Sequence, residues 1–333
     1  MTIGRLGCAF AAAVSLAACT TDSGSPSQAT SSPPTALAEQ DAYISVIKAV
    51  SPSVVEIGTA SGLGSGVVYD DRGDIVTNSH VVGQATQVTV TSSDGKRYPG
   101  TVVSSFPPDD LAVVRVAEAK LKPVVFADSS KVQVGEIVLA VGSPLGLQSS
   151  ATEGIVSATG RVVSEGPNVA LPDTIQTSAA INPGNSGGAL VDLNAQVVGI
   201  PTLAAVSPGV GGLAPGIGCA ISSNRVKIIA DQIVKGGRVT NSQRAYLGIE
   251  ATDTTAGAIQ VAAVVAGGPA ASAGIMPGDL IKSVANHATP TSAVLAQVLA
   301  TLKPGQTVPV ELMSSVDGTQ RTTNVRLGEY PGG

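Results

Sequence analysis

The sequence predicts a mainly β protein, in which two small antiparallel barrels are followed by an α+β domain. Glycine (39 residues) and proline (21 residues) are abundant, and valine and threonine recur in short runs, which favours β-structure with many turns. The strand-like runs form two sets of about six, separated by turn signals such as Asp94-Gly95, and two such sets are typical of a pair of small barrels. From residue 243 onwards, short strand-like runs alternate with a helical pattern instead.

The expected elements follow in chain order. A helix is predicted over 37–50, because its apolar positions recur at roughly helical spacing and Ser51-Pro52 ends it. The first set of strands is predicted at 54–59, 66–69, 74–77, 87–91, 97–104, 111–116, 124–127 and 137–141. The second set is predicted at 155–158, 174–178, 189–192, 197–202 and 218–221, and a helix over 223–234 ends at Gly236-Gly237.

Composition places the chain among globular proteins, because 43% of its 333 residues are hydrophobic and 13% are charged. Aromatic residues make up 2%, so the core must be aliphatic. The net charge of −5 and the absence of a basic cluster argue against nucleic-acid binding. Two of the three cysteines lie within the first 19 residues, which excludes an internal disulfide framework and a cysteine-based metal site. We expect no metal and no cofactor.

The first 18 residues are predicted to be a signal peptide. Arg5 is followed by an apolar run that is shorter than the about 20 residues needed to span a membrane. The run ends in Leu16-Ala17-Ala18-Cys19, which resembles the bacterial lipobox, and this resemblance implies cleavage before Cys19 and lipid attachment there. The alternative is an ordinary signal peptide cut nearby. Residues 19–36 are mostly Ser, Thr, Pro and Gln and are expected to form a flexible tether that links the body to a membrane.

The stretch 182–190, Asn-Pro-Gly-Asn-Ser-Gly-Gly-Ala-Leu, carries the main functional signal. A serine hydroxyl is a poor nucleophile unless a base takes its proton and donors hold the oxyanion that forms. Glycines allow a backbone to turn so tightly that its amides point into one concavity. Ser186 is therefore a candidate nucleophile, with an oxyanion hole formed by the amides of Gly184 and Ser186. The alternative is a simple Gly/Asn turn between two strands.

Two further residues complete a candidate triad. His80, one of only two histidines, follows a predicted strand, and Asp110 opens another. Each alone would be read as a structural residue, but the order His80, Asp110, Ser186 is the chain order of chymotrypsin-like enzymes. The first barrel would then supply the base and the carboxylate, and the second barrel the nucleophile, with a cleft between them. The neighbouring Asp109 is expected to be a solvated loop residue.

Three segments resemble the signature segments of bacterial HtrA/Deg-type serine proteases: 77–82 (Thr-Asn-Ser-His-Val-Val), 110–113 (Asp-Leu-Ala-Val) and 181–190. The resemblance implies a chymotrypsin-like double β-barrel over 37–242. It also implies an exported, ATP-independent serine endopeptidase that cleaves unfolded or damaged envelope proteins through an acyl-enzyme. The competing hypothesis is a non-catalytic binder or chaperone whose triad is present but locked.

The same resemblance implies a specificity site. Ala180 would line the primary (S1) pocket, and its lack of charge does not favour Lys or Arg substrates. Ile200, Pro201 and Thr202 would form the edge strand that pairs with substrate, although Pro201 replaces the family's usual Asn and has no N–H. Residues 202–216 would form an activation loop rather than a passive connector.

The region 243–333 resembles a PDZ domain of the protease-associated kind; the alternative is an unspecialised α+β domain. PDZ domains accept an extended peptide as an added strand and hold its terminal carboxylate in a backbone nest. By resemblance this nest is formed by Tyr246, Leu247, Gly248 and Ile249. Unfolded polypeptides and C-terminal peptides are thus the expected partners. The family also forms trimers through its N-terminal segment, which here could involve Tyr43.

Overall fold

The computed structural model describes residues 34–60, 62–117, 120–143, 150–166, 169–182, 184–206, 213–255, 257–315 and 317–332. The predicted signal peptide, Cys19 and most of the predicted tether lie outside the described residues, as does part of the predicted activation loop. Residues 1–39 and 40–333 form two separate compact units. Within the described residues, no helix is both long enough and apolar enough to cross a membrane.

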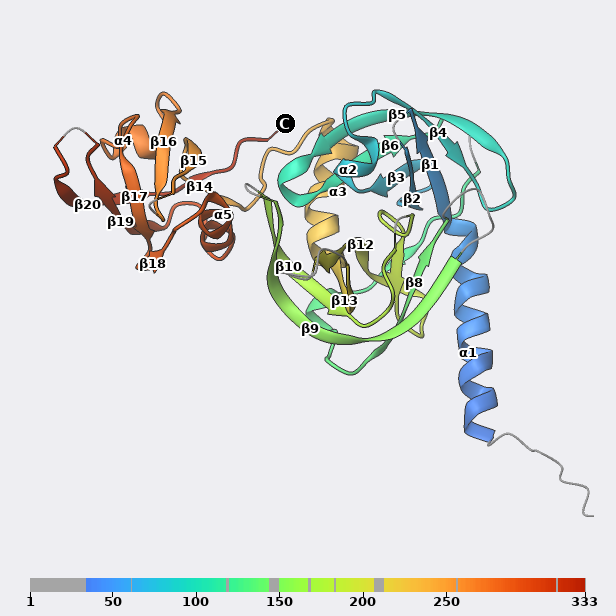
Figure 1. Ribbon diagram of the computed structural model, residues 1–333. Coiled ribbons are helices and arrows are strands. Elements are labelled where there is room, and N and C mark those ends of the chain that lie inside the picture. Colours follow the sequence, from blue (N-terminus) through green and yellow to red (C-terminus); the bar gives the residue numbers. More distant parts are fainter. Residues whose placement is uncertain are drawn as a thin grey trace, which may run out of the picture. The chain divides into compact units, whose positions relative to one another are not determined.

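The first barrel is a closed ring of six antiparallel strands in the order β1-β2-β3-β6-β5-β4 (Figure 1). Its strands are β1 (Val54–Thr59), β2 (Gly62–Val68), β3 (Asp74–Thr77), β4 (Gln87–Thr91), β5 (Arg97–Phe106) and β6 (Leu111–Arg115). Alternate residues such as Val88 and Val90 point into the barrel, as half-buried strands require. The helices associated with it are α1 (Pro34–Val50), α2 (Ser79–Val82) and the 3-10 turns η1 (Ser51–Ser53) and η2 (Pro107–Asp109).

The second barrel follows the strand order β11-β8-β9-β10-β13-β12, and pairing of β11 with β12 closes it. Its strands are β8 (Ile137–Gly142), β9 (Ser150–Gly166), β10 (Val169–Thr177), β11 (Ala189–Val191), β12 (Gln196–Val206) and β13 (Leu213–Ser222). The short strand β7 (Val125–Phe126) adds to β12 in parallel, and the turn η3 (Ser129–Lys131) follows it.

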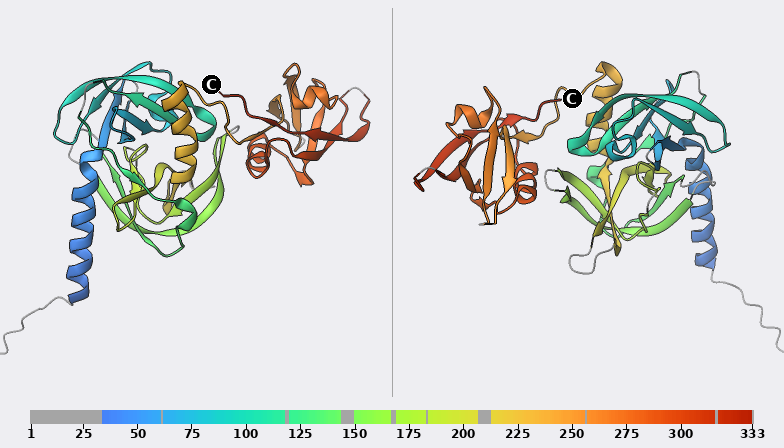
Figure 2. Two further views of the ribbon diagram at one scale, coloured as in Figure 1. Left: turned by 180° about the vertical axis from the view of Figure 1, so that it is seen from behind. Right: turned by 45° about the horizontal axis from the view of Figure 1, so that its top comes forward.

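Both barrels share one aliphatic core with helix α3 (Ser223–Gly236) (Figure 2). Val76 of the first barrel, Leu139 of the second and Ile229 of α3 belong to this core cluster, and all are buried. Ser222 caps α3 by accepting a hydrogen bond from the amide of Arg225. The cluster therefore fixes the two barrels against each other, as a site assembled from both requires.

The third domain has its own core, which includes Leu247, Ile259, Ile281 and Leu295. Its main sheet has the order β15-β16-β17-β19-β20, with β18 paired to β17, and β14 pairs with β21 in a separate ribbon. The strands are β14 (Ala245–Tyr246), β15 (Ile249–Asp253), β16 (Ile259–Val264), β17 (Leu280–Val284), β18 (His287–Ala288), β19 (Thr307–Met313), β20 (Gln320–Arg326) and β21 (Gly328–Glu329). The helices are α4 (Pro269–Ser272) and α5 (Ser292–Ala300), and β15 is an edge strand of the main sheet.

The predicted mainly β class with two barrels and an α+β domain is confirmed. Strands β1, β3 and β4 have the predicted bounds. Strand β9 runs for 17 residues, although only 155–158 was predicted, because its other residues are mostly Ser, Thr, Gly and charged residues, and Val162 and Val163 are too few to give a clear apolar pattern. Long-range pairing with β8 and β10 holds this polar strand in place.

Candidate active site

His80 and Asp110 meet in the first barrel. His80 lies on the short helix α2 directly after β3, and Asp110 directly follows η2. The imidazole Nδ1 of His80 lies 2.8 Å from Asp110 Oδ2, and the backbone amide of His80 donates to Asp110 Oδ1 at 2.9 Å. A carboxylate on Nδ1 favours the tautomer that carries its proton there, so Nε2 is the nitrogen able to accept a proton.

The backbone of Asp110 is fixed as firmly as its side chain. Its φ of 49° and ψ of 42° lie in the left-handed region, which Asp tolerates better than most residues. Its carbonyl accepts hydrogen bonds from the amide of Ser79 (3.1 Å) and from Asn78 Nδ2 (3.0 Å). The Asp110 side chain is 5% exposed and that of His80 is 45% exposed. A buried carboxylate thus orients an imidazole that reaches solvent.

Thr202 connects the carboxylate to the nucleophile. Its hydroxyl donates to Asp110 Oδ2 at 2.6 Å, and its carbonyl accepts a hydrogen bond from Ser186 Oγ at 2.8 Å. The structure therefore gathers Ser186, Thr202, Asp110 and His80 into one chain of contacts, although they come from different barrels. The sequence indicated Thr202 only as a substrate-pairing residue, and its contact with Asp110 is an addition.

Within 184–188, some of the backbone amides donate hydrogen bonds to carbonyls. The amides of Asn185, Gly187 and Gly188 donate to the carbonyls of Asn182, Pro201 and Asn185. Among the described residues, the amides of Gly184 and Ser186 donate to no acceptor. Gly184 has a φ of 103°, a conformation that residues with a side chain rarely adopt. The two amides predicted to form an oxyanion hole are thus the two of residues 184–188 that donate to no acceptor among the described residues.

Ser65 of β2 holds this turn from the opposite barrel. Its amide donates to the carbonyl of Ser186 (2.9 Å), and its hydroxyl donates to the carbonyl of Gly184 (2.5 Å). The same hydroxyl accepts from the amide of Ser143 at 2.8 Å. Ser65 is fully buried. The sequence did not indicate this role, because no local pattern reveals a contact between the two barrels.

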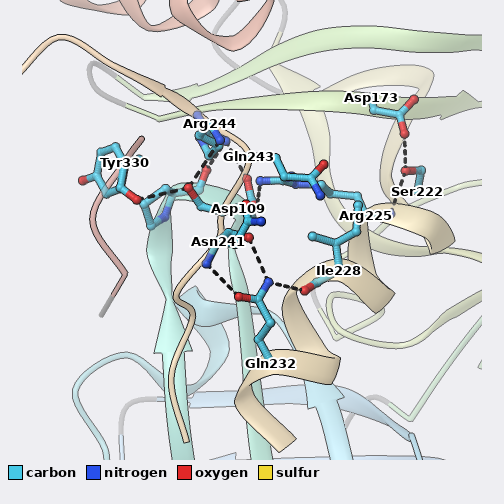
Figure 3. A network of polar contacts seen from close by, with 12 residues as sticks. Asp109, Asp173, Ser222, Arg225, Ile228, Gln232, Asn241, Gln243, Arg244 and Tyr330 are labelled. Carbon is cyan, nitrogen blue, oxygen red and sulfur yellow. Dashed lines mark hydrogen bonds and ion pairs between the residues drawn. The ribbon is translucent and has the colours of Figure 1, made fainter. Parts of the chain in front are cut away.

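The expectation that Asp109 is a solvated loop residue is wrong. Its side chain is 1% exposed and lies between Arg225 of α3 and Arg244 (Figure 3). Arg244 Nη1 donates to Asp109 Oδ1 at 2.6 Å, and Arg225 Nη2 contacts Asp109 Oδ2 at 2.5 Å as an ion pair outside hydrogen-bond geometry. Burial of an unpaired carboxylate is strongly unfavourable. Here two arginines from distant segments of the chain offset that cost.

The predicted specificity residues lie close to the nucleophile turn. Ala180 is exposed, and its carbonyl accepts hydrogen bonds from Asn185 Nδ2 (3.3 Å) and Thr152 Oγ1 (2.8 Å). Ile200 and Pro201 lie in β12 and pair with β13, and both are buried. The carbonyl of Pro201 accepts from Gly187 and so helps to position the turn. Of the three residues predicted to pair with substrate, only Thr202 contacts the predicted nucleophile and carboxylate.

The predicted peptide-carboxylate loop connects β14 to β15. The carbonyls of Leu247 and Gly248 accept from the amides of Ala270 and Val265. Among the described residues, the amides of Leu247 and Gly248 donate to no backbone carbonyl, and the φ of Gly248 is 80°. The segment therefore keeps two backbone amides unpaired with backbone carbonyls of the described residues, directly before the edge strand β15.

The comparisons with known proteins find two families along the chain. The family described as Trypsin-like peptidase domain matches residues 64–200, and the family described as PDZ domain matches residues 245–327. The serine protease PepD of Mycobacterium tuberculosis is 40% identical, and the alignment covers 92% of this chain and 71% of the relative. The periplasmic serine endoprotease DegP of Escherichia coli is 39% identical over 80% of this chain, but this chain spans only 56% of its length.

The fold is also similar to solved structures. A serine endoprotease from Yersinia pestis has a TM-score of 0.60 and 34% sequence identity, with 86% of this chain and 98% of that chain covered. A structure described as the HtrA-type protease AlgW with tripeptide has a TM-score of 0.60 and 33% identity, with 87% and 97% covered. The chymotrypsin-like double barrel followed by a PDZ domain is thereby confirmed as the fold class.

Proposed function

Because the chain belongs to the HtrA-type family of serine endoproteases, we propose that it is an exported enzyme that hydrolyses unfolded or damaged envelope proteins without ATP. The observation that carries the proposal is the turn at Ser186, whose two unengaged amides lie beside a hydroxyl linked through Thr202 to the His80–Asp110 pair. Acyl transfer requires a nucleophile, a base with its orienting carboxylate and donors for the oxyanion, and the residues gathered here supply candidates for each of these parts.

Each residue has a distinct role. Ser186 Oγ attacks the peptide carbonyl while His80 takes the hydroxyl proton, which it later gives to the leaving amine. Asp110 holds the imidazole and stabilises the imidazolium. The amides of Gly184 and Ser186 bind the oxyanion, and a donor of this kind contributes about 3 kcal/mol to the stability of the transition state. Water then hydrolyses the acyl-enzyme, with His80 again acting as the base.

One movement precedes the reaction. Ser186 Oγ donates to the carbonyl of Thr202, so its proton points at β12 in this arrangement. Rotation about the Cα–Cβ bond of Ser186 turns the proton towards His80 Nε2. We infer that substrate binding along β12 favours this rotation, since an added strand competes for the carbonyl groups at that edge.

Substrate preference follows from the uncharged side chain at Ala180. A small apolar S1 pocket suits Val, Ala or Ile, with discrimination of about 1–3 kcal/mol per methylene. The third domain supplies a second peptide site, with the carboxylate at Tyr246, Leu247, Gly248 and Ile249 and the chain along β15. A peptide with a free C-terminal carboxylate should bind this domain, whereas the same peptide with an amidated C-terminus should bind at least tenfold more weakly.

Location and assembly complete the proposal. Relatives named as periplasmic support an extracytoplasmic location, and lipid attached to Cys19 would anchor the protein to the membrane. Replacing Cys19 with Ala should release the protein from the membrane fraction, and retention would contradict the anchor.

The proposed homotrimer predicts three times the monomer mass in sedimentation. Tyr43 lies half-buried against the core of the barrels, so it is available only in part for contacts between copies.

The central experiment tests Ser186. Wild type and Ser186→Ala are compared for cleavage of unfolded casein and for labelling by a fluorophosphonate probe, with and without a C-terminal peptide. We expect the variant to lose both activities while its thermal unfolding is unchanged. Equal casein turnover by the two proteins would refute the proposal. Absence of labelling in the wild type under every peptide tested would favour a binder or chaperone with a locked triad.

A further inference from the structure

A buried ion-pair cluster lies directly beside the predicted triad, and the mechanism above does not use it. Asp109 is the residue before Asp110, and it contacts Arg225 and Arg244. The side chains of Asp109, Arg225 and Arg244 are 1%, 7% and 10% exposed. One carboxylate thus faces two guanidinium groups away from solvent, and such clusters tolerate little displacement because an unpaired buried charge is costly.

Arg244 forms hydrogen bonds to several groups in and beside the turn. Besides Asp109, its Nη1 donates to the carbonyl of Pro108 at 2.7 Å, and its Nη2 donates to the carbonyl of Ala170 at 2.7 Å. A guanidinium presents its donors in a rigid fork, so these hydrogen bonds fix the position of η2 relative to β10. The same guanidinium also supplies a positive charge to Asp109. Arg244 immediately precedes β14 and belongs to the segment that leads into the PDZ domain.

A second contact with the same turn comes from the residue that follows β21. Tyr330 follows β21, and its ring packs edge-on against Phe106, the residue before η2, with centroids 6.2 Å apart. The amide of Tyr330 donates to the carbonyl of Arg244 at 2.8 Å, so the two residues act as one unit. Figure 3 shows Tyr330 and Arg244 on the same side of Asp109. The β14–β21 ribbon therefore contacts both ends of the segment 106–109.

This segment determines where Asp110 lies. The amide of Asp110 donates to the carbonyl of Pro107, and its left-handed conformation leaves little freedom between η2 and the carboxylate. We propose that Arg244 and Tyr330 are positioning residues for the carboxylate of Asp110, so that the β14–β21 ribbon clamps the turn on which the proposed triad depends. The inference rests on the proposed function only in that Asp110 orients the base.

The test compares Arg244→Ala with Arg238→Ala, which removes an exposed arginine from the same connecting segment. We expect Arg244→Ala to lower kcat by between about tenfold and about a hundredfold with KM within twofold, since a displacement of about 1 Å has effects of this size. Arg238→Ala should match the wild type. Arg244→Lys should recover part of the loss, because lysine can pair with Asp109 but cannot reproduce the fork. Tyr330→Leu should also lower kcat with little change in KM, but by a smaller factor than Arg244→Ala.

A second readout does not depend on activity. The proton between His80 Nδ1 and Asp110 gives a low-field ¹H NMR signal, which Asp110→Asn identifies by removing it. Arg244→Ala should shift or broaden this signal at a temperature well below its unfolding transition, and Arg238→Ala should leave it unchanged. A wild-type protein that is inactive while Arg244→Ala still shifts the signal would refute the protease proposal but support the clamp. An unchanged signal together with kcat within twofold of wild type would overturn the clamp.

Discussion

The two turns that meet at the candidate active site are held in different ways. The nucleophile turn at 182–188 carries no charged residue and is held by neutral hydrogen bonds, notably from the amide and hydroxyl of Ser65. The carboxylate turn at 107–110 carries two buried aspartates, and Asp109 is held by two arginines. One turn must keep its amides available, and the other must keep a carboxylate in place.

The difference follows from what each turn contributes to catalysis. The proposed oxyanion hole needs the amides of Gly184 and Ser186 to stay unengaged, and Ser65 meets this need because it contacts the carbonyls of these two residues. Asp110 contributes a buried carboxylate and not a free amide, so ion pairs at the neighbouring residue can hold its turn in place. We therefore expect damage to the nucleophile turn to affect kcat more than stability, and loss of the ion pairs of the carboxylate turn to lower stability by a larger amount.

Asp110→Asn gives the largest expected effect. An amide cannot hold the imidazole in the required tautomer, and kcat should fall by about 10⁴-fold while KM changes little. Steady-state kinetics on a short peptide substrate measures this effect, with Asp71→Asn at an exposed position as the control. A loss of less than tenfold would show that Asp110 does not orient the base.

Asp109→Ala should mainly affect stability. Removing one partner leaves Arg225 and Arg244 buried without their counter-charge, which costs about 3–5 kcal/mol of unfolding free energy. Urea unfolding of wild type and variant measures the difference. If the chain does not fold, Asp109→Asn keeps the shape and removes only the charge. A change below about 1 kcal/mol in both variants would indicate that the ion pairs contribute no more than surface pairs do.

Ser65→Ala tests the nucleophile turn. Loss of the hydroxyl frees the carbonyl of Gly184, and kcat should fall between about tenfold and about a hundredfold, less than the loss of a direct oxyanion donor. The unfolding free energy should fall by about 2 kcal/mol, because the hydroxyl's two hydrogen bonds, to Gly184 and from Ser143, are each worth about 1 kcal/mol net. Ser93→Ala, at an exposed serine of the same barrel, serves as the control. Equal kcat in wild type and Ser65→Ala would remove Ser65 from the positioning network.

The smallest expected effect concerns Asp128, an exposed support of the helix that carries Arg225. Hydrogen bonds from Asn224 Nδ2 and from the hydroxyl and amide of Ser130 lower the pKa of Asp128 to about 2. A carboxyl group whose pKa is lower in the folded state than in the unfolded state stabilises the protein while it is ionised, above about pH 4. This stabilisation is lost as the pH falls towards 2. The difference in Tm between wild type and Asp128→Asn should therefore shrink over that range. A constant difference between pH 6 and pH 2 would contradict this.

Much of the fold could be predicted from the sequence, and so could the candidate triad, whose His80 and Asp110 meet in the structure. Strands β1, β3 and β4 have alternating or continuous apolar residues bounded by turn signals, and their bounds were predicted correctly. The glycines of 182–190 indicated a tight turn, and Gly184 and Gly187 adopt φ values of 103° and 81° there. These features depend on backbone conformations set by neighbouring residues, which a sequence displays directly.

What the sequence determined by itself is local: where the strands run, where the chain turns, and which residue types stand at the three reactive positions. Only the tertiary structure decided the surroundings of those positions. Arg244 is 135 residues from Asp109, and Ser65 is 119 residues from Gly184. Nothing near Asp109 in the chain distinguishes a solvated aspartate from a buried one. The distinction depends on which distant cations the packing of α3 and the β14–β21 ribbon brings to it, because burial of a charge is stable only where its partners are already in place.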